Sequence, residues 1–424
     1  MALVFGVLFA VALLLLLKCL TGRKRRPGEP PVVQGWIPFI GQTIEFGRDS
    51  HGFLLSCQRK LGDVFTVYIA GKYVTFILDP FLFHLISQLG KQIDFQEFSL
   101  GLAAKVFGFP ILNDPKIPIS NEEIHKLYHY LKGDELNILI RSTTENLQNI
   151  MRRDLVRSTE WRIEYMYDFC CRIIFEATYV SLYGKAPINE EKKITELKEK
   201  FIKFDQMFPY LAASIPIELL GNTKRIHKEL ISYLTSKELD QRLCMAKLIQ
   251  GRRDLFDRYP YLQDDQKAGS AIDEAFRLGS SSMNIRFVKE DVNINFKEEK
   301  EIKLRKGDLT AIYPQILHMD PEVFEDPEVY KYDRFIENGM KKTTFYKGGK
   351  KLRNYLMPFG SGASKCPGRY FAVSEIKMFI SLILTAFDLE IIHQERPVMP
   401  SKSRVGLGVL HPESDVQFRY KLRQ

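Results

Sequence analysis

Apolar residues recur along the chain in two rhythms, one typical of strands and one typical of helices. Two strand-like runs, 65–69 and 73–78, flank Ala70-Gly71-Lys72, as in a β-hairpin. Strand patterns return at 302–309 and, with alternating apolar positions, at 416–420. Helical spacing predicts helices over 120–130 (opened by a Ser120/Glu123 capping box), 136–152 and 161–183. These patterns predict a mainly α chain with small β-sheets, of the α+β class.

Cys366 stands in the most informative local pattern, Phe359-Gly360-Ser361-Gly362-Ala363-Ser364-Lys365-Cys366-Pro367-Gly368. Apolar residues then recur at helical spacing from Phe371 to Phe387, so a helix is predicted to begin at Pro367. A cysteine at a helix N-terminus is favoured as a thiolate, and glycines let the backbone approach a large flat group. This arrangement suits the proximal ligand of a haem iron. On this pattern alone, a small buried cysteine without chemistry is an equal alternative.

Size and composition favour one large domain. The 424 residues are 45% hydrophobic and 12% aromatic, enough to bury a sizeable core. Six cysteines show neither zinc spacing nor a secretory framework, which indicates a reduced, cytosol-facing body, and the eight histidines do not cluster as metal ligands. The net charge is +9, but the basic residues are not interleaved with exposed aromatic residues on a small domain, so we expect no nucleic-acid partner. An anionic membrane or an acidic protein fits this charge better.

The N-terminus begins with an apolar run. No charged or polar side chain occurs in residues 1–17, and Arg23-Lys24-Arg25-Arg26 follows. A basic cluster after the run, no basic residue before it and no small-residue cleavage site favour an uncleaved anchor over a signal peptide. We therefore predict a single-pass transmembrane helix at 1–20, a basic and proline-rich hinge at 21–35, and a cytoplasmic body at 36–424.

Phe359, Gly362, Cys366 and Gly368 match Phe-x-x-Gly-x-x-x-Cys-x-Gly, and here the chain resembles the cytochrome P-450 monooxygenases. Two upstream elements of that family occur in its order, Glu274-Ala275-Phe276-Arg277 and Tyr332-Asp333-Arg334-Phe335. A Glu–Arg pair three residues apart is common in helices, so only the combination is specific.

The resemblance implies a set of site residues and a cofactor. Cys366 is expected to be the catalytic residue and the ligand of the iron of haem b. The other haem-binding residues implied are Phe359, Gly362, Gly368 and Arg286, of which Arg286 is expected to pair with a haem propionate. Glu274, Arg277 and Arg334 are expected to form a buried structural network.

The resemblance also implies partners. O₂ is the co-substrate, and NADPH supplies electrons indirectly through NADPH–cytochrome P-450 reductase. The reductase is expected to dock on a run of basic residues that precedes Cys366. This run comprises Lys341, Lys342, Lys347, Lys350, Lys351 and Arg353, and a solvated charged face is the alternative. The apolar, proline-broken stretch 207–220 is expected to roof the substrate channel and touch lipid, with core packing as its alternative. The implied location is the endoplasmic reticulum membrane.

Similarity over nearly the whole chain is closest to the branch of the family that hydroxylates oxysterols at the 7α position. The segments that carry it are 25–31, 35–38, 71–81, 215–222 and 355–360. This implies an oxysterol substrate such as 25- or 27-hydroxycholesterol, within cholesterol catabolism and bile acid synthesis. An isomerase similar to prostacyclin synthase is a weaker alternative, which would need no reductase.

The chain departs from the family pattern in three places. Ser364 stands where a basic residue usually precedes the cysteine by two positions, and no clear Trp-x-x-x-Arg occurs near His125. The largest departure lies between about 245 and 271, which is too short and polar to hold the apolar helix that crosses the distal face of haem. We therefore expect an incomplete cytochrome P-450 fold with a deletion there. A non-catalytic, shortened isoform that folds partly or binds haem without turnover is the main alternative to an active enzyme.

Overall fold

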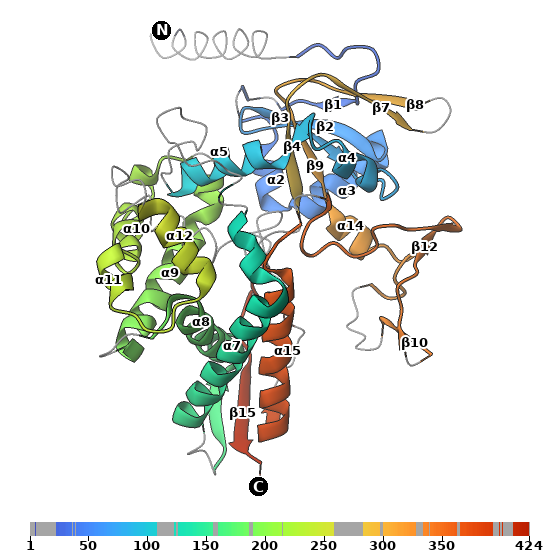
Figure 1. The fold of residues 1–424 in the computed structure, drawn as a ribbon. Helices are drawn as coiled ribbons and strands as arrows, with labels where there is room; N and C mark the ends of the chain where they lie inside the picture. Colours follow the sequence, from blue (N-terminus) through green and yellow to red (C-terminus); the bar gives the residue numbers. More distant parts are fainter. Residues whose placement is uncertain are drawn as a thin grey trace. The chain divides into compact units, whose positions relative to one another are not determined.

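The computed structural model describes residues 5, 23–35, 37–38, 40–107, 123, 126–155, 160–185, 190–213, 215–257, 283–296, 300–327, 334–338, 340–362, 365–392, 398, 401 and 410–423. The chain divides into two compact units (Figure 1). The first combines 1–99, 280–365 and 402–410, and the second combines 100–279, 366–401 and 411–424. The division falls between Lys365 and Cys366, within the loop that the sequence singles out.

The first unit contains a six-stranded sheet in the order β1-β2-β3-β9-β6-β4. Its strands are β1 (Val32–Val33), β2 (Val64–Ile69), β3 (Lys72–Ile77), β4 (Ile93–Asp94), β6 (Asn284–Val288) and β9 (Leu309–Ile312). Its helices are α2 (Thr43–Arg48), α3 (Ser50–Leu61), α4 (Phe83–Gln88) and α14 (Pro314–His318). Four two-residue strands and one longer hairpin complete it, namely β7 (Val292–Phe296), β8 (Lys300–Leu304), β10 (Ile336–Glu337), β11 (Met340–Lys341), β12 (Tyr346–Lys347) and β13 (Lys350–Lys351). Early and late segments of the chain therefore share one sheet.

The predicted hairpin at 65–78 is confirmed. β2 and β3 pair antiparallel with Ile69 opposite Lys72, so Ala70 and Gly71 alone form the turn. Both turn residues have positive φ, 48° and 76°, as the tight turn favoured by strand twist requires. The predicted strand and turn at 302–309 are also confirmed, because β8 ends at Leu304 and β9 begins at Leu309.

A row of buried polar residues crosses the first sheet in register. Thr66 pairs with Thr75, Thr75 with Thr310, and Thr310 with Arg286. Directly paired residues point to the same face of a sheet, so the four side chains line one face. The Thr66 and Thr75 hydroxyls lie 2.8 Å apart, and the Thr310 hydroxyl donates to the Thr75 carbonyl at 3.2 Å. The three threonines thus form hydrogen bonds among themselves.

Residues 23–33, which follow the apolar N-terminal run, are tied to the first unit by ion pairs. The carboxylate of buried Glu29 accepts hydrogen bonds from the Arg305 guanidinium at 2.7 and 2.8 Å. Arg23 pairs with Asp308, and both side chains are almost fully buried. The described hinge residues are therefore held against the first sheet.

The second unit is mainly helical. Its helices are α7 (Gly133–Asp154), α8 (Met166–Tyr183), α9 (Glu190–Ala212), α10 (Thr223–Ser232), α11 (Ser236–Asp240), α12 (Lys247–Asp257) and α15 (Arg369–Ala386), with short 3₁₀ turns at Leu127–Leu131 and Ile217–Leu219. Helix α5 (Phe95–Phe107) spans the division between the units. A three-stranded sheet has the order β14 (Phe387–Ile391), β15 (Gln417–Leu422), β5 (Arg162–Tyr165).

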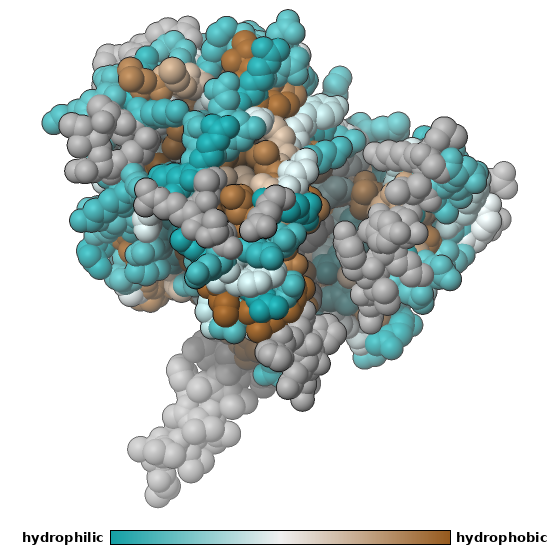
Figure 2. Space-filling model, turned by 90° about the horizontal axis from the view of Figure 1, so that it is seen from below, coloured by the Kyte–Doolittle hydropathy of each residue, from teal (hydrophilic) through white to brown (hydrophobic). Residues whose placement is uncertain are grey.

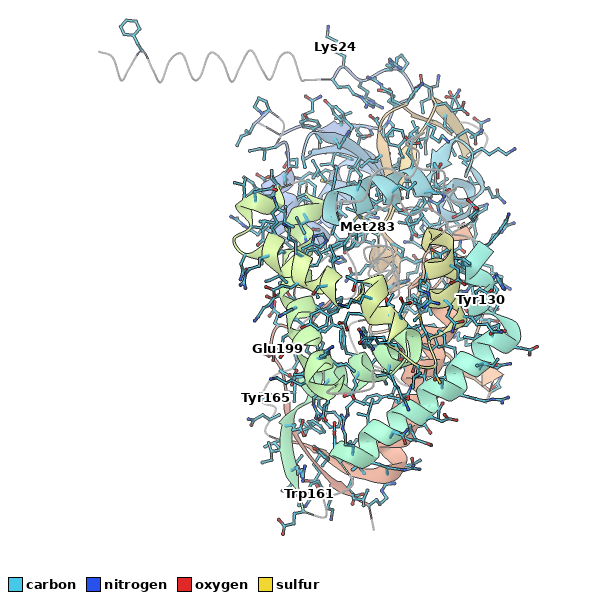
Figure 3. The ribbon with its side chains drawn as sticks, turned by 60° about the vertical axis from the view of Figure 1, so that its left-hand side comes forward. Lys24, Tyr130, Trp161, Tyr165, Glu199 and Met283 are labelled. Carbon is cyan, nitrogen blue, oxygen red and sulfur yellow. The ribbon has the colours of Figure 1, made fainter. Side chains whose placement is uncertain are left out.

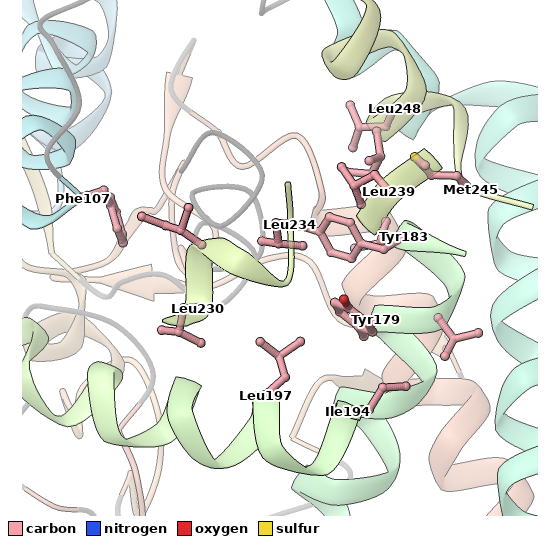
Figure 4. Packing of buried hydrophobic residues seen from close by; sticks show 14 of the residues in the cluster. Phe107, Tyr179, Tyr183, Ile194, Leu197, Leu230, Leu234, Leu239, Met245 and Leu248 are labelled. Carbon is pink, nitrogen blue, oxygen red and sulfur yellow. The ribbon is translucent and has the colours of Figure 1, made fainter. Parts of the chain in front are cut away.

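Two apolar clusters form the core of the second unit. One joins α8, α9, α10 and α12, and Figure 4 shows Tyr183, Leu197 and Leu234 converging within it. The other joins α7, α8, α15 and the three-stranded sheet, with Ile173 fully buried. The predicted helix at 136–152 lies within α7, so it is confirmed, and the apolar alternation before 420 is confirmed as β15.

The predicted helix at 161–183 is wrong at its start. Residues 162–165 form β5, which pairs antiparallel with β15, and the helix begins only at Met166. Trp161 lies under the side chains of Arg419 and Lys421, at 4.5 and 5.0 Å from their cationic atoms (Figure 3). Pairing with a strand far away in the sequence overrides the local helical periodicity here.

Several predictions fall at or beyond the edge of the described residues. Ser120 of the proposed capping box lies outside them, and so does the predicted anchor 1–20 apart from Phe5. Within the described part of the chain, no helix has the length and apolar character needed to cross a bilayer. The stretch 207–220 is interrupted, although not at Pro209, because α9 continues through Pro209 to Ala212 and a 3₁₀ turn at Ile217–Leu219 follows Pro216.

Candidate functional site

We call residues 359–368 the cysteine loop, which the division between the two units splits after Lys365. Glycines fix the backbone conformation of its first-unit part. Gly360 and Gly362 have φ values of 76° and 62°, in the region that side chains disfavour. A Cβ at Gly362 would lie 3.0 Å from Ser87 Cβ and Ser87 O on α4. This close approach needs glycine at position 362, which was predicted from the motif as a haem-binding residue. Phe359, also predicted, is half-buried.

Arg286 on β6 contacts this loop. Its guanidinium Nη2 donates to Ser361 O at 3.2 Å and lies 3.4 Å from Ser361 Oγ, and its side chain is only 2% exposed. Burial lowers the pKa of Arg286 below its usual value, and the negative charge of Asp94 opposes this. An arginine nevertheless stays protonated in a protein, so the site contains a buried positive charge.

Two buried donors on β6 have no hydrogen-bond partner among the residues that the structure describes. They are Arg286 Nε and Asn284 Nδ2. Asn284 is 7% exposed and, two positions from Arg286 on the same strand, lies on the same face of the sheet. Unpartnered buried donors are uncommon in proteins and indicate a missing acceptor. These donors fit an anionic group such as a haem carboxylate.

His318 supports the chain just before the loop. Its Nε2 accepts a hydrogen bond from the Met357 N–H at 3.2 Å. Burial lowers the pKa of His318 to about 4, so the ring is neutral near pH 7 and its nitrogen is free to accept. The histidine therefore helps to fix the approach to Phe359 without adding charge.

Cys366 begins the part of the loop that belongs to the second unit. It is buried, at 9% exposure, and precedes α15 by three residues. The predicted helix is confirmed, but its predicted start at Pro367 is wrong, because Gly368 is the N-cap and Arg369 the first helical residue. Arg369 Nη1 donates to Cys366 O at 2.8 Å, which anchors the cysteine backbone to the first turn. Cys366 thus lies at a helix N-terminus, as expected.

Three other cysteines are buried or half-buried. Burial raises the pKa of Cys57 and Cys171, and it raises that of Cys170 to about 11. These three therefore remain thiols near pH 7, and a neutral thiol is a poor metal ligand.

Helix α15 carries a second buried ionisable residue, Glu375. Its Oε1 accepts a hydrogen bond from Thr178 Oγ1 on α8 at 2.6 Å. Burial raises the pKa of Glu375 to about 7, and the bond from Thr178 partly opposes this. The carboxyl group therefore carries a proton in a large fraction of molecules near neutral pH.

One face of α15 is apolar and uncovered. Phe379 and Ile383 are buried against α7 and α8, whereas a stripe three to four residues apart on the other side is exposed. The exposed stripe comprises Val373, Ile376, Ile380 and Leu384, with exposed fractions of 38%, 49%, 48% and 54%. Apolar side chains are visible at the surface in the view from below (Figure 2). A helix that is apolar on two sides is typical of a buried element.

The predicted structural network is only partly described. Arg334 is half-buried, and its guanidinium donates to the backbone carbonyls of Glu325 and Asp326. Glu274 and Arg277 lie outside the described residues, so the three-residue network stays a prediction.

The predicted docking cluster lies on short hairpins of the first unit. Lys342 pairs with Glu337 at 3.4 Å, and Lys347 pairs with Asp320. Lys350 and Lys351 of β13 are exposed, and so is Arg353. Among the residues that the structure describes, these three exposed cations form no ion pair, so an acidic surface can approach them directly.

Sequence reasoning missed Ser87, Ser361, Asn284 and His318. Ser361 lies inside the motif, but nothing local marks Ser87, which is 274 residues away from it in the chain. The alternation of polar and apolar residues over 284–287 was the available signal for Asn284, since it places Asn284 and Arg286 on one face of a strand.

The chain matches known proteins along nearly its whole length. The family model for cytochrome P450 matches residues 30–269 and 257–419. The chain is 39% identical to cytochrome P450 7B1 of Mus musculus, across 99% of this chain and 96% of that protein. It is 35% identical to cytochrome P450 7A1 of Sus scrofa, across 95% of each. It is 36% identical to the 25-hydroxycholesterol 7-alpha-hydroxylase of Rattus norvegicus, across 78% and 96%.

A solved structure has the same fold. Retinoic acid bound cyanobacterial CYP120A1 superposes with a TM-score of 0.61 at 17% identity, covering 94% of this chain and all of that one.

The alignment to the Mus musculus protein is longer than the chain itself. It spans 491 positions against 424 residues, so at least 67 positions have no residue here.

Proposed function

The chain belongs to the cytochrome P450 family, and from this premise we propose that it is a monooxygenase that hydroxylates oxysterols at the 7α position. The observation that carries the proposal is the identity of 35–39% to family members 7A1 and 7B1 over at least 95% of the chain. The 36% identity to a 25-hydroxycholesterol 7-alpha-hydroxylase supports 25-hydroxycholesterol as the first substrate to test. The pathway would be cholesterol catabolism and bile acid synthesis.

Membership of the family brings haem b as the cofactor, O₂ as co-substrate and electrons from NADPH through a reductase. Haem supplies the oxygen-activating chemistry when bound, and the protein's part is to hold it, orient the substrate and exclude water. The residues fit this role. Cys366 would ligate the iron from a helix N-terminus, and Arg286 would bind a carboxylate of haem through its unpartnered donor.

Other residues would shape the same site. Gly362 and Gly368 would allow the backbone close to the porphyrin, with Phe359 beside it. Glu274, Arg277 and Arg334 would brace the surrounding core. Ser361 and Cys366 are five residues apart, so the chain allows at most about 17 Å between their Cα atoms. That span is compatible with contacts to one porphyrin.

The decisive experiment is a reduced carbon monoxide difference spectrum of the purified chain, followed by turnover of 25-hydroxycholesterol with reductase and NADPH. A thiolate-type spectrum and NADPH-dependent 7α product would support the proposal. Turnover without NADPH would instead favour an isomerase similar to prostacyclin synthase. If the chain gave neither a thiolate-type spectrum nor a 7α product, the proposal that it is an enzyme would be refuted.

We also propose that the chain has lost an internal segment between about 245 and 271. Two observations support this, the match of the family model in two separate segments that overlap at 257–269 and the alignment positions that have no residue here. The exposed stripe of α15 supports it too, because a helix apolar on two sides needs cover on both. This favours a second candidate function, a shortened isoform that binds haem without turnover.

The membrane proposal keeps the anchor at 1–20 and the body on the cytoplasmic side of the endoplasmic reticulum. The apolar run followed by Arg23–Arg26 supports it. Exposed Tyr210, Ile215 and Leu219 support an additional lipid contact at 207–220. Protease added to sealed microsomes should digest the body, and protection of the body would overturn the topology.

A further inference from the structure

A small polar cluster in the first unit connects α4 to the cysteine loop and to β6. Ser87 Oγ lies 2.8 Å from the Phe83 carbonyl oxygen of its own helix and 2.8 Å from Ser361 Oγ. Ser361 is 3% exposed, and its carbonyl oxygen accepts from Arg286 Nη2. The Arg286 guanidinium is therefore held on one side by a loop that is itself held by a helix hydroxyl. We call Ser87, Ser361 and Arg286 the serine–arginine cluster.

The serine–arginine cluster leaves donors unused. Arg286 Nε and Asn284 Nδ2 have no hydrogen-bond partner in the described part of the chain, although both residues are more than nine-tenths buried. Thr310, which pairs with Arg286 on the sheet, donates its hydroxyl to the Thr75 carbonyl and accepts from neither of these two donors. A buried donor without an acceptor destabilises a fold, so an external acceptor is expected.

The charge and number of these donors define the acceptor. A buried guanidinium favours an anion, and two donors from one strand face suit the two oxygens of a carboxylate. The cysteine loop lacks the basic residue two positions before Cys366, where Ser364 stands instead. A carboxylate on a bound haem therefore has fewer cations available from the loop and depends more on β6.

We propose that Asn284 and Arg286 jointly bind one carboxylate of haem, and that Ser87 and Ser361 are positioning residues that hold Arg286 for this contact. The inference rests on the proposed function, since it takes haem as the ligand. It adds three residues to the site, one donor and two hydroxyls that fix the geometry of the arginine.

The test compares two porphyrins on the purified haem-free chain. Iron protoporphyrin IX carries the carboxylates, and its dimethyl ester does not. The ratio of the two dissociation constants measures what carboxylate recognition contributes, separately from iron ligation and from folding. We expect the wild type to prefer the acid form at least tenfold.

Asn284→Asp is the sharpest variant. It preserves the size of the side chain and removes an amide donor that bonds to no described residue, but it places a negative charge beside the carboxylate. We expect the preference for iron protoporphyrin IX to fall at least tenfold while binding of the ester stays within twofold. Asn284→Ala should lose the preference by a smaller factor.

Ser361→Ala and Ser87→Ala should each lower the preference about fivefold, which corresponds to one ordinary hydrogen bond. Ser50→Ala is the matched control, because Ser50 is a buried helix serine of the same unit whose hydroxyl donates to the Phe46 carbonyl. It should leave the preference unchanged.

If Asn284→Asp and Ser361→Ala weakened the binding of both porphyrins equally, Asn284 and Ser361 would have purely structural roles, and the inference would be overturned. If the wild type bound neither porphyrin, the proposed function itself would fail. If it bound both equally, haem binding would stand and carboxylate recognition by β6 would be excluded. A circular dichroism spectrum and melting temperature of each variant identify misfolding, and the isosteric Asn284→Asp remains decisive if a serine variant misfolds.

Discussion

The cysteine loop joins two regions that are incomplete in opposite ways. Upstream, on β6 of the first unit, buried polar donors lack acceptors at Asn284 and Arg286. Downstream, on α15 of the second unit, the buried carboxyl of Glu375 has a partner in Thr178, while an apolar stripe is left exposed. Within the described residues, the first region has buried donors without an acceptor, and the second has apolar side chains exposed to solvent. These are two distinct physical signatures, which we propose to be those of a cofactor and of a chain segment.

The largest expected effect is at the residue that begins the downstream region. Cys366→Ala or Cys366→His should abolish the thiolate-type spectrum in the reduced carbon monoxide assay, because no other group of the loop is a thiol. Cys57→Ala and Cys171→Ala are controls and should retain it, since both thiols stay protonated. A thiolate-type spectrum in Cys366→Ala would refute the ligand assignment.

Restoring the segment that we propose to be deleted should sharpen the comparison at α15. A chain carrying the corresponding residues of a relative between about 245 and 271 should turn over 25-hydroxycholesterol at least tenfold faster per haem than the chain as it stands. The reason is that oxygen activation needs a dry pocket with a fixed shape. Equal rates in a parallel assay would mean that other residues already close the site.

The two sides of α15 should respond differently to the same substitution. Ile383→Ala on the buried side should lower the free energy of unfolding by about 2–4 kcal/mol through the cavity that it leaves. Ile380→Ala on the exposed side should change it by less than about 0.5 kcal/mol.

Denaturant unfolding measures both isoleucine variants. In the chain with the segment restored, Ile380→Ala should become as costly as Ile383→Ala. A cost for Ile380→Ala in the short chain would show that the stripe is already covered.

The buried ionisable groups of the two regions should give opposite pH dependence. Glu375 has a folded pKa of about 7 against a reference of 4.5, so as pH rises from 4.5 to 7 the unfolded state loses its proton first. Its contribution to stability should therefore fall by up to about 3 kcal/mol over this range. Denaturant unfolding at pH 5 and pH 8 should show that Glu375→Gln is more stable relative to the wild type at pH 8 than at pH 5. Glu199→Gln, a substitution at an exposed glutamate, is the control.

His318 should show the reverse trend on the loop side. Its folded pKa of about 4 lies below the reference of 6.5, so stability is present above pH 6.5 and is lost as pH falls towards 4. His318→Gln should remove that acid-side loss, up to about 3 kcal/mol. Exposed His129→Gln is the control, and identical acid profiles for His318→Gln and the wild type would contradict the assignment.

The smallest effect concerns the exposed charges of the first unit. Lys350→Glu combined with Lys351→Glu should slow electron transfer from the reductase about three- to fivefold at low salt, since surface charges mainly affect association. Lys72→Glu, another exposed charge reversal, is the control. Stopped-flow measurement of haem reduction gives the rate for both variants. If the lysine double variant and Lys72→Glu slowed reduction equally, the predicted docking cluster would be only a solvent-exposed charged surface.

Local patterns were sufficient for much of this protein. The β2–β3 hairpin, α7 and α15 follow from the spacing of apolar residues, because the backbone hydrogen bonds of a helix or a tight hairpin join residues close in sequence. The motif around Cys366 likewise predicted a cysteine at a helix N-terminus, although not the residue at which the helix begins.

Other features depend on contacts between distant segments and could be decided only by the tertiary structure. Residues 162–165 form a strand because β15, some 250 positions later, supplies its hydrogen bonds. Ser87 acquires a role because α4 packs against the loop, and Arg286 is buried because β6 joins β9 in a sheet begun near the N-terminus. The pattern of apolar and polar residues reflects the local preference for helix or strand. Burial and unpartnered donors arise only after folding brings remote residues together.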